Sequence, residues 1–215
     1  MKLTYYGHSC FLITGNSGTR ILTDPCDPET GYCLKEIAAD AVTVSHEHHD
    51  HNYVQAAAGT PEIIRTAGLH VVKDITIEGI PAWHDNDRGV QRGENMIYRM
   101  ELDGMRLVHL GDLGHVPDET LAQAIGPADV LLCPIGGVYT IDTAQALETA
   151  ERLQARILIP MHYSTPQLTF PLGGLEELLR LAKDRGIHRV NDSTCSISQD
   201  AIGEKRILIL NHRKN

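Results

Sequence analysis

The segment 45–51, with the sequence SHEHHDH, places four side chains suited to metal binding within six positions, namely His46, His48, Asp50 and His51. Imidazole nitrogens and carboxylate oxygens are common zinc ligands. Four of them can converge only where the backbone is irregular, so we expect a loop here. His46 and His48 could reach one ion, and Asp50 and His51 could turn toward a second. The alternative is a solvated polar turn that is rich in histidine.

Three further residues of ligand type each follow an apolar run. His84 follows 80–83, Asp112 follows 106–110 and His162 follows 156–159. Loops that leave the ends of strands are where α/β folds usually build binding sites. Taken singly, each residue fits an ordinary turn or core position better than a metal ligand. Together with the segment 45–51, they predict a site for two metal ions.

Composition narrows the class of protein. The 215 residues carry a formal net charge of −9, which argues against a nucleic-acid-binding surface rich in Lys and Arg. Five irregularly spaced cysteines without a CxxC pair disfavour a zinc ribbon or a thioredoxin-like motif. The sequence has neither an apolar signal segment at its start nor a run long enough to span a membrane. We therefore expect a cytoplasmic protein that acts on a small molecule, with oligomerisation left open.

Short β-type runs dominate the first half of the chain. The links 15–18 and Asp103-Gly104 both predict hairpins. The expected strands are 2–6, 10–14, 20–24, 41–45, 61–65, 70–72, 75–78, 80–83, 97–102 and 106–110.

The second half alternates strands with helices. Pro117 suits the first position of a helix to 125, a capping box at 142–145 opens a helix to about 154, and a third helix from Leu175 is expected to end at Gly186. Strands are expected at 130–133, 156–159 and 207–210. This order predicts one mixed α/β domain over residues 1–215, with layered sheets.

The series of motifs resembles the metallo-β-lactamase superfamily. Thr23-Asp24-Pro25, the HxHxDH segment 46–51, His84, Gly111-Asp112 and His162 follow one another in the order of that superfamily, so the likeness runs from about Met1 to Tyr163. The resemblance implies a four-layer αβ/βα sandwich with the metals at one edge between the sheets.

The resemblance also implies a division of the ligands. His46, His48 and His84 would hold one ion, Asp50, His51 and His162 the other, and Asp112 would bridge both. Asp24 would be a buried carboxylate that supports the ligand loop, since metal-bound imidazoles need orienting partners. Two divalent ions are expected, zinc first, with manganese, iron and nickel as alternatives that the same ligands suit.

Weaker signals resemble the lactonase-like branch, which includes the ascorbate-6-phosphate lactonase. They are Tyr6-Gly7-His8-Ser9, the run 109–115 and the run 134–140. His8 and His115 either face the pocket as substrate contacts or proton donors, or are a packed strand-end residue and a helix-entry residue. Tyr139 could equally line the cleft or be a buried tyrosine of the core. Arg88 and Arg92 belong to a stretch that fits a solvated loop better than a site for an anionic substrate.

These residues predict a metal-dependent hydrolase. Hydroxide held between two ions would attack a small ester, a lactone or a phosphorylated metabolite, and Asp50 would orient the nucleophile or pass a proton. The alternatives are a phosphodiesterase or nuclease of the same superfamily, a mononuclear-iron redox enzyme, and a metal-binding relative without catalysis.

Overall fold

Two large sheets form the body of the protein, for which a computed structural model describes residues 1–203 and 205–213. The strands of the first half are β1 (Lys2–Gly7), β2 (Cys10–Thr14), β3 (Arg20–Thr23), β4 (Ile37–Ala38), β5 (Ala41–Thr43), β6 (Ala57–Ala58), β7 (Glu62–Ile64), β8 (Gly68–Val72), β9 (Ile75–Trp83), β10 (Glu94–Leu102) and β11 (Met105–His109). Those of the second half are β12 (Val130–Pro134), β13 (Ile157–Met161), β14 (Gly186–Val190), β15 (Thr194–Ser196) and β16 (Arg206–Leu210).

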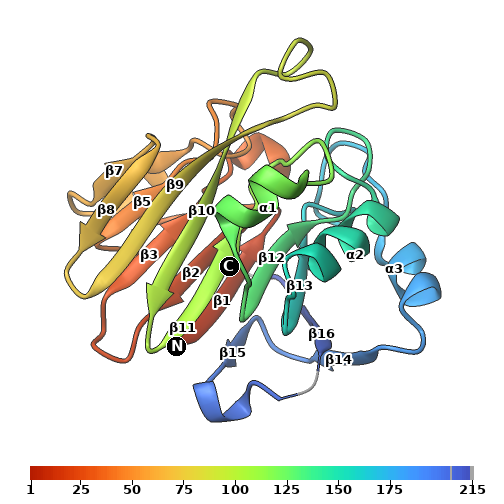
Figure 1. Cartoon of the computed structure of the whole chain (residues 1–215). Helices are drawn as coiled ribbons and strands as arrows, with labels where there is room; N and C mark the ends of the chain where they lie inside the picture. The colour runs from red at the N-terminus through yellow and green to blue at the C-terminus, as the bar shows by residue number, and fades with distance from the viewer. Residues whose placement is uncertain (204, 214–215) are drawn as a thin grey trace.

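The order of strands is β15-β1-β2-β3-β5-β7 in a six-stranded sheet and β14-β16-β13-β12-β11-β10-β9-β8 in an eight-stranded sheet, with β4 and β6 paired separately. The sheets lie face to face (Figure 1), and one core cluster joins buried side chains of both, among them Leu3 and Phe11 on one side and Ile77 and Leu107 on the other. The period-2 alternation of the strands sends Leu22 and Val42 to the opposite face of the six-stranded sheet.

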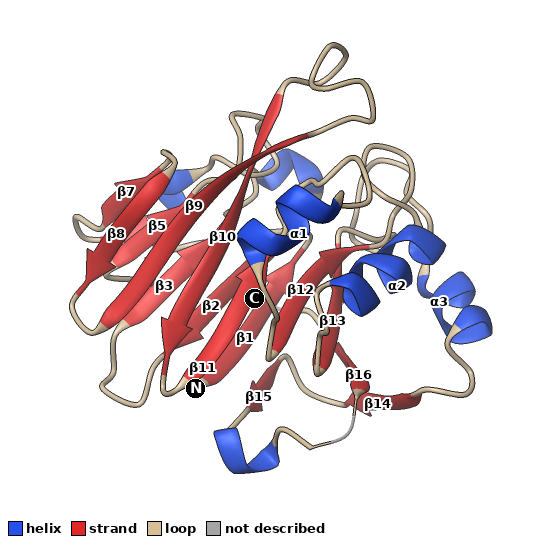
Figure 2. Cartoon of the chain, viewed as in Figure 1, coloured by secondary structure: helices blue, strands red, loops and turns tan. Residues whose placement is uncertain are grey.

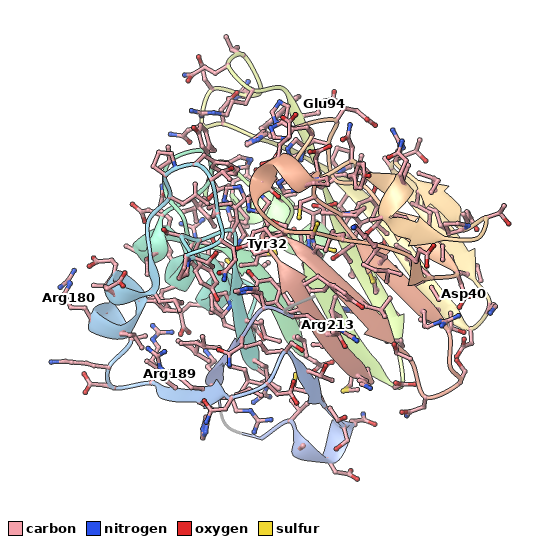
Figure 3. The ribbon with its side chains drawn as sticks, turned by 180° about the vertical axis from the view of Figure 1, so that it is seen from behind. Tyr32, Asp40, Glu94, Arg180, Arg189 and Arg213 are labelled. Carbon is pink, nitrogen blue, oxygen red and sulfur yellow. The ribbon has the colours of Figure 1, made fainter. Side chains whose placement is uncertain are left out.

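Three α-helices cover the outer face of the eight-stranded sheet, namely α1 (Glu119–Ile125), α2 (Thr143–Arg152) and α3 (Leu175–Leu181) (Figure 2). Two mostly irregular stretches, 25–40 and 44–57, flank β5 and cover the outer face of the six-stranded sheet, where a second core forms. They contribute Tyr32, Leu34 and Ile37 and include the short 3-10 turns η1 (Pro28–Thr30) and η2 (Val54–Ala56) (Figure 3). The predicted layered sandwich is confirmed, with this outer layer made of irregular chain. None of the described helices is both long and apolar enough to cross a membrane.

Local signals explain most of these elements. The Asp142 side chain accepts a hydrogen bond from the Gln145 backbone N–H, and the Gln145 side chain accepts one from the Asp142 backbone N–H. The predicted capping box is therefore confirmed. The Asp103-Gly104 turn joins β10 to β11 as expected. Helix α1 begins after Asp118, whose carboxylate caps it, rather than at Pro117.

Two expectations about element boundaries are wrong. Residues 75–83 form one strand, although a break was expected before Ile80. Helix α3 ends at Leu181, and Gly186 opens β14 instead of capping the helix. In both places pairing with a later strand decides the outcome, β10 for β9 and β16 for β14.

The strand directions bring the ligand-type residues to one edge. β3 and β5 are parallel, β9 and β11 are both antiparallel to β10, and β11, β12 and β13 are parallel. The carboxyl ends of β9, β11 and β13 therefore share one edge of the eight-stranded sheet. The loop 84–93 projects beyond this edge (Figure 1), and Glu94, at its end, lies at the top of the view from behind (Figure 3).

Candidate metal centre

Asp112 lies at the centre of a cluster of histidines. Its Oδ2 atom is 3.1 Å from His162 Nε2, 3.4 Å from His84 Nε2 and 3.9 Å from His46 Nε2, while its Oδ1 atom is 3.2 Å from His51 Nε2. The carboxylate is almost fully buried. Asp112 thus touches members of both expected ligand groups, which is the position a bridging ligand needs.

The first group contains His46, His48 and His84. Their candidate ligand atoms all lie within 4.8 Å of one another. The rings meet edge to face, with centroids 4.6 Å apart for His46 and His48 and for His46 and His84. His46 and His84 are buried while His48 is exposed, so this group opens toward solvent on the His48 side.

The second group contains Asp50, His51, His162 and one further member, His8. Their candidate ligand atoms also lie within 4.8 Å of one another. His8 Nε2 is 3.1 Å from Asp50 Oδ2, and its ring centroid is 4.3 Å from that of His162. The His162 backbone N–H donates to the His8 carbonyl at 2.9 Å, which ties the β1–β2 turn to the end of β13. His8, which could equally have been a packed strand-end residue, therefore lies inside the cluster.

Asp24 holds the ligand loop from below. Its Oδ1 atom accepts the Ser45 backbone N–H at 2.8 Å, and its Oδ2 atom accepts the Ser45 hydroxyl at 2.6 Å and His51 Nδ1 at 2.9 Å. Because the Ser45 hydroxyl donates to Asp24, it accepts from His46 Nδ1, 2.9 Å away. Both imidazoles then carry a proton on Nδ1 and present Nε2 as the atom that would bind metal.

The metal-free cluster has an electrostatic bias toward cations. Burial alone would lower the pKa of His51, but the nearby carboxylates of Asp112 and Asp50 outweigh it and raise that pKa well above its usual value. Burial would raise the pKa of Asp112, but the charges of His162 and His51 hold it well below the usual range. A buried site that keeps carboxylates ionised and draws a proton onto an imidazole is a site that favours positive charge.

The donor atoms fit a metal. His46 Nε2, His51 Nε2, His162 Nε2 and Asp112 Oδ1 are buried and make no hydrogen bond within the described part of the chain. Buried polar atoms are normally paired, so atoms left unpaired together demand an explanation. They lie close together without hydrogen-bond geometry between them, as nitrogen and oxygen donors aimed at shared ions do. Such donors are those that zinc and related divalent ions accept.

A cavity of about 560 Å³ gives access to the cluster. Its walls include ligand-type residues and side chains from three loops outside the cluster, namely Arg92, Tyr139 and Phe170. Tyr139 thus faces the cleft rather than the core. His115 lines a separate hollow beside α1, together with Arg88.

Sequence reasoning missed two contributors. Asn95 is fully buried, accepts the Asp112 backbone N–H at 2.8 Å and donates to the Leu110 carbonyl at 2.9 Å, so it fixes the loop that presents Asp112. No motif marks this residue. Phe170 lies in a stretch without regular structure, which also gave no signal.

Comparison with known proteins agrees with this geometry. The family model of the β-lactamase superfamily domain matches residues 2–162. A UPF0173 metal-dependent hydrolase of Thermococcus kodakarensis is 32% identical over 86% of this chain and 93% of its own. A second UPF0173 metal-dependent hydrolase, from Carboxydothermus hydrogenoformans, is 30% identical over 82% and 91%. A crystal structure from Thermotoga maritima, described as a candidate zinc-dependent hydrolase of the metallo-β-lactamase superfamily, superposes with a TM-score of 0.80 at 33% identity, covering 97% of this chain and 98% of that one.

A sandwich of sheets with a His/Asp cluster at one edge defines a metal-dependent hydrolase. The chain belongs to the metallo-β-lactamase superfamily, among its UPF0173 metal-dependent hydrolases. The predicted superfamily and enzyme class are confirmed, while the lactonase-like branch stays a prediction.

Proposed function

We propose that the enzyme hydrolyses a small ester, a lactone or a phosphorylated metabolite with two divalent ions, zinc first. His46, His48 and His84 would hold one ion, Asp50, His51 and His162 the other, and Asp112 both. The lactonase-like motifs, Tyr6-Gly7-His8-Ser9 among them, favour an ester or lactone.

The observation that carries this proposal is the convergence of unpaired donors on Asp112. Four imidazole nitrogens from three segments, the loop 45–51 and the loops that begin at His84 and His162, lie 3.1–3.9 Å from its two oxygens. A single ion would leave part of this set without a partner. The two groups of ligand atoms, each spanning no more than 4.8 Å, support one ion each.

Bound divalent ions supply a Lewis acid that polarises a carbonyl or phosphoryl oxygen and lowers the pKa of a coordinated water. The protein's own residues orient the reactants. Asp50 lines the cavity. In this proposal its carboxylate would hold the attacking water and receive its proton. His8 lies 3.1 Å from Asp50 Oδ2 and restrains that carboxylate. His48 and His84 line the same cavity beside Asp112.

Size and charge favour a small molecule over a nucleic acid. The cavity of about 560 Å³ lies within the range of small-ligand sites. One basic side chain lines it, Arg92, and the chain as a whole carries a net charge of −9. A phosphodiester polymer would need a longer basic track to neutralise its backbone.

Metal analysis combined with a hydrolase panel tests the proposal. The wild-type protein should bind two ions per chain and hydrolyse at least one of a set of lactones, thioesters, phosphodiesters and β-lactams. His48→Ala should lose one ion and most activity, whereas His188→Ala, an exposed histidine on β14, should lose neither. A folded wild-type protein that binds no metal would overturn the proposal, and unchanged metal content in His48→Ala would overturn the ligand assignment.

A further inference from the structure

One basic side chain reaches the cavity over the metal cluster. Arg92 is half-buried in the loop 84–93 that joins β9 to β10, and it lines the same cavity of about 560 Å³ as His48, His84 and Asp112. The other charged residues that line this cavity are acidic, Glu47 and Asp50 among them. Glu47 is already paired with Arg65 at 2.6 Å.

The loop that carries Arg92 is organised around one buried carboxylate. Asp85 Oδ1 accepts the backbone N–H groups of Asp87 and Gly89, each at 2.8 Å. Asp85 Oδ2 accepts those of Gln91 at 2.9 Å and Arg92 at 2.8 Å. Four bonds to one side chain fix the path of the loop, and the last of them holds the backbone of Arg92 itself. The position of Arg92 is therefore built into the fold.

The guanidinium of Arg92 lies over an aromatic ring and has no carboxylate partner in the described part of the chain. Its central carbon lies 5.6 Å from the centre of the Tyr139 ring, and Tyr139 packs in turn against Phe170, with ring centroids 6.3 Å apart. Among the described residues, no acidic side chain forms an ion pair with Arg92. A guanidinium that lies over an aromatic ring and meets no carboxylate leaves its N–H donors free for a planar or tetrahedral anion.

We propose that Arg92 binds an anionic group of the substrate, a carboxylate or a phosphate, while the bond to be hydrolysed lies at the metal cluster. This inference rests on the proposed function and adds its substrate class. Asp85 and Tyr139 are positioning residues that hold Arg92 over the cavity. Phe170 and the Tyr139 ring give the substrate an apolar wall between its anionic group and the metals.

Arg88 supplies a matched control. It lies in the same loop, carries the same charge and is exposed, but it lines the hollow beside α1 and not the metal cavity. A general effect of positive charge on anionic substrates would be shared by both arginines. A specific contact would belong to Arg92 alone.

The test uses matched aryl acetates and the metal-loaded full-length protein. The probes are 4-acetoxybenzoate, 4-acetoxyphenyl phosphate and the neutral methyl 4-acetoxybenzoate. Arg92→Ala should lower kcat/KM for the preferred anion about tenfold to a hundredfold, mainly through KM, because a charge-assisted bond is lost. The neutral ester should change less than about twofold, as should all three probes with Arg88→Ala. Arg92→Lys should fall between Arg92→Ala and the wild type.

Calorimetric binding of the products 4-hydroxybenzoate, 4-hydroxyphenyl phosphate and neutral methyl 4-hydroxybenzoate separates the two proposals. If the wild type hydrolyses none of the esters yet binds an anion through Arg92, the choice of reaction is wrong and the anion site stands. If Arg92→Ala leaves the ratio of anionic to neutral probes unchanged, or if Arg88→Ala lowers it equally, the role of Arg92 is overturned. Failure of the wild type to bind either anion overturns it as well. The two anionic arms decide between carboxylate and phosphate.

Discussion

Replacing Asp24 with asparagine should weaken both proposed metal sites through the tautomers of two histidines. In the wild type, Asp24 only accepts hydrogen bonds, from the Ser45 backbone, the Ser45 hydroxyl and His51 Nδ1. An asparagine that keeps its oxygen toward the Ser45 backbone presents an amide donor to the other two. His51 must then accept on Nδ1 and carry its proton on Nε2. The Ser45 hydroxyl turns to donate to His46 Nδ1, with the same result there.

The structure also sets the size of the effect. Loss of a partner that orients a metal-bound imidazole typically costs 10- to 100-fold in metal affinity, which is about 1.4–2.7 kcal/mol per ion. If the asparagine amide were flipped, its oxygen would accept from His51 and the Ser45 hydroxyl, and both histidine tautomers would be preserved. Its NH2 group would then face the Ser45 backbone N–H, which is also a donor. A buried donor without an acceptor costs about 1–3 kcal/mol of folding free energy. Asp24→Asn must therefore lose metal affinity, stability or both.

Competition with a chromophoric zinc chelator measures the two dissociation constants, and urea unfolding of the metal-free protein measures stability. Ser45→Ala is the matched variant, because it removes the acceptor for His46 Nδ1 while the bond from His51 Nδ1 to Asp24 remains. Ser45→Ala should weaken the binding of one ion only, whereas Asp24→Asn should weaken the binding of both. The reasoning is refuted if Asp24→Asn matches the wild type in both dissociation constants and in its urea midpoint.

Two further predictions concern the loops at this edge. Gly111→Ala should lower the free energy of unfolding by about 2–4 kcal/mol in urea titrations, because a Cβ at this left-handed position (φ +55°) would lie 2.3 Å from Asn95 Oδ1. Gly104→Ala, whose Cβ would meet nothing closer than 3.1 Å, should cost only about 1–2 kcal/mol, and equal losses would contradict the steric argument. Burial raises the pKa of Asp85, but four backbone N–H bonds outweigh it and lower that pKa to about 2. The ionised carboxylate therefore stabilises the loop 84–93 at pH values above the ordinary carboxyl pKa, and this stabilisation is lost as the pH falls toward 2. The fluorescence of Trp83, the single tryptophan, should report this acid transition. If Asp85→Asn shows the same transition while its far-UV circular dichroism stays native, the transition does not come from protonation of Asp85.

The sequence was most informative where short-range rules decide the structure. The capping box at Asp142 and the turn at Asp103-Gly104 each depend on a few adjacent residues, and both formed as predicted. The candidate ligands were found for a related reason. Each directly follows an apolar strand, and the strands run so that their carboxyl ends meet at one edge.

Long-range packing explains what the sequence could not show. Gly79 looked like a break between two strands, but it lies inside β9, where the Thr66 backbone crosses so closely that a Cβ would lie 2.4 Å from the Thr66 carbonyl oxygen. A glycine inside a strand can mark such a close approach instead of an end. Arg92 and Tyr139 meet across two loops that are distant in sequence, so no local pattern could place either of them over the cavity. His115 was expected to be either a substrate contact or proton donor or a helix-entry residue, and it lies against a separate hollow.

The backbone at the centre indicates that its geometry is set by the surrounding fold. His8, Asp24 and His162 have left-handed φ values of 53°, 38° and 50°, which cost non-glycine residues about 1–3 kcal/mol each. Such conformations persist only where neighbouring structure enforces them. The carbonyl of His8 accepts both the His162 N–H and the Tyr5 hydroxyl, and the Asp24 N–H donates to the Thr43 carbonyl on β5. The strain is held by the sheets, so the ligands need little rearrangement to receive their ions.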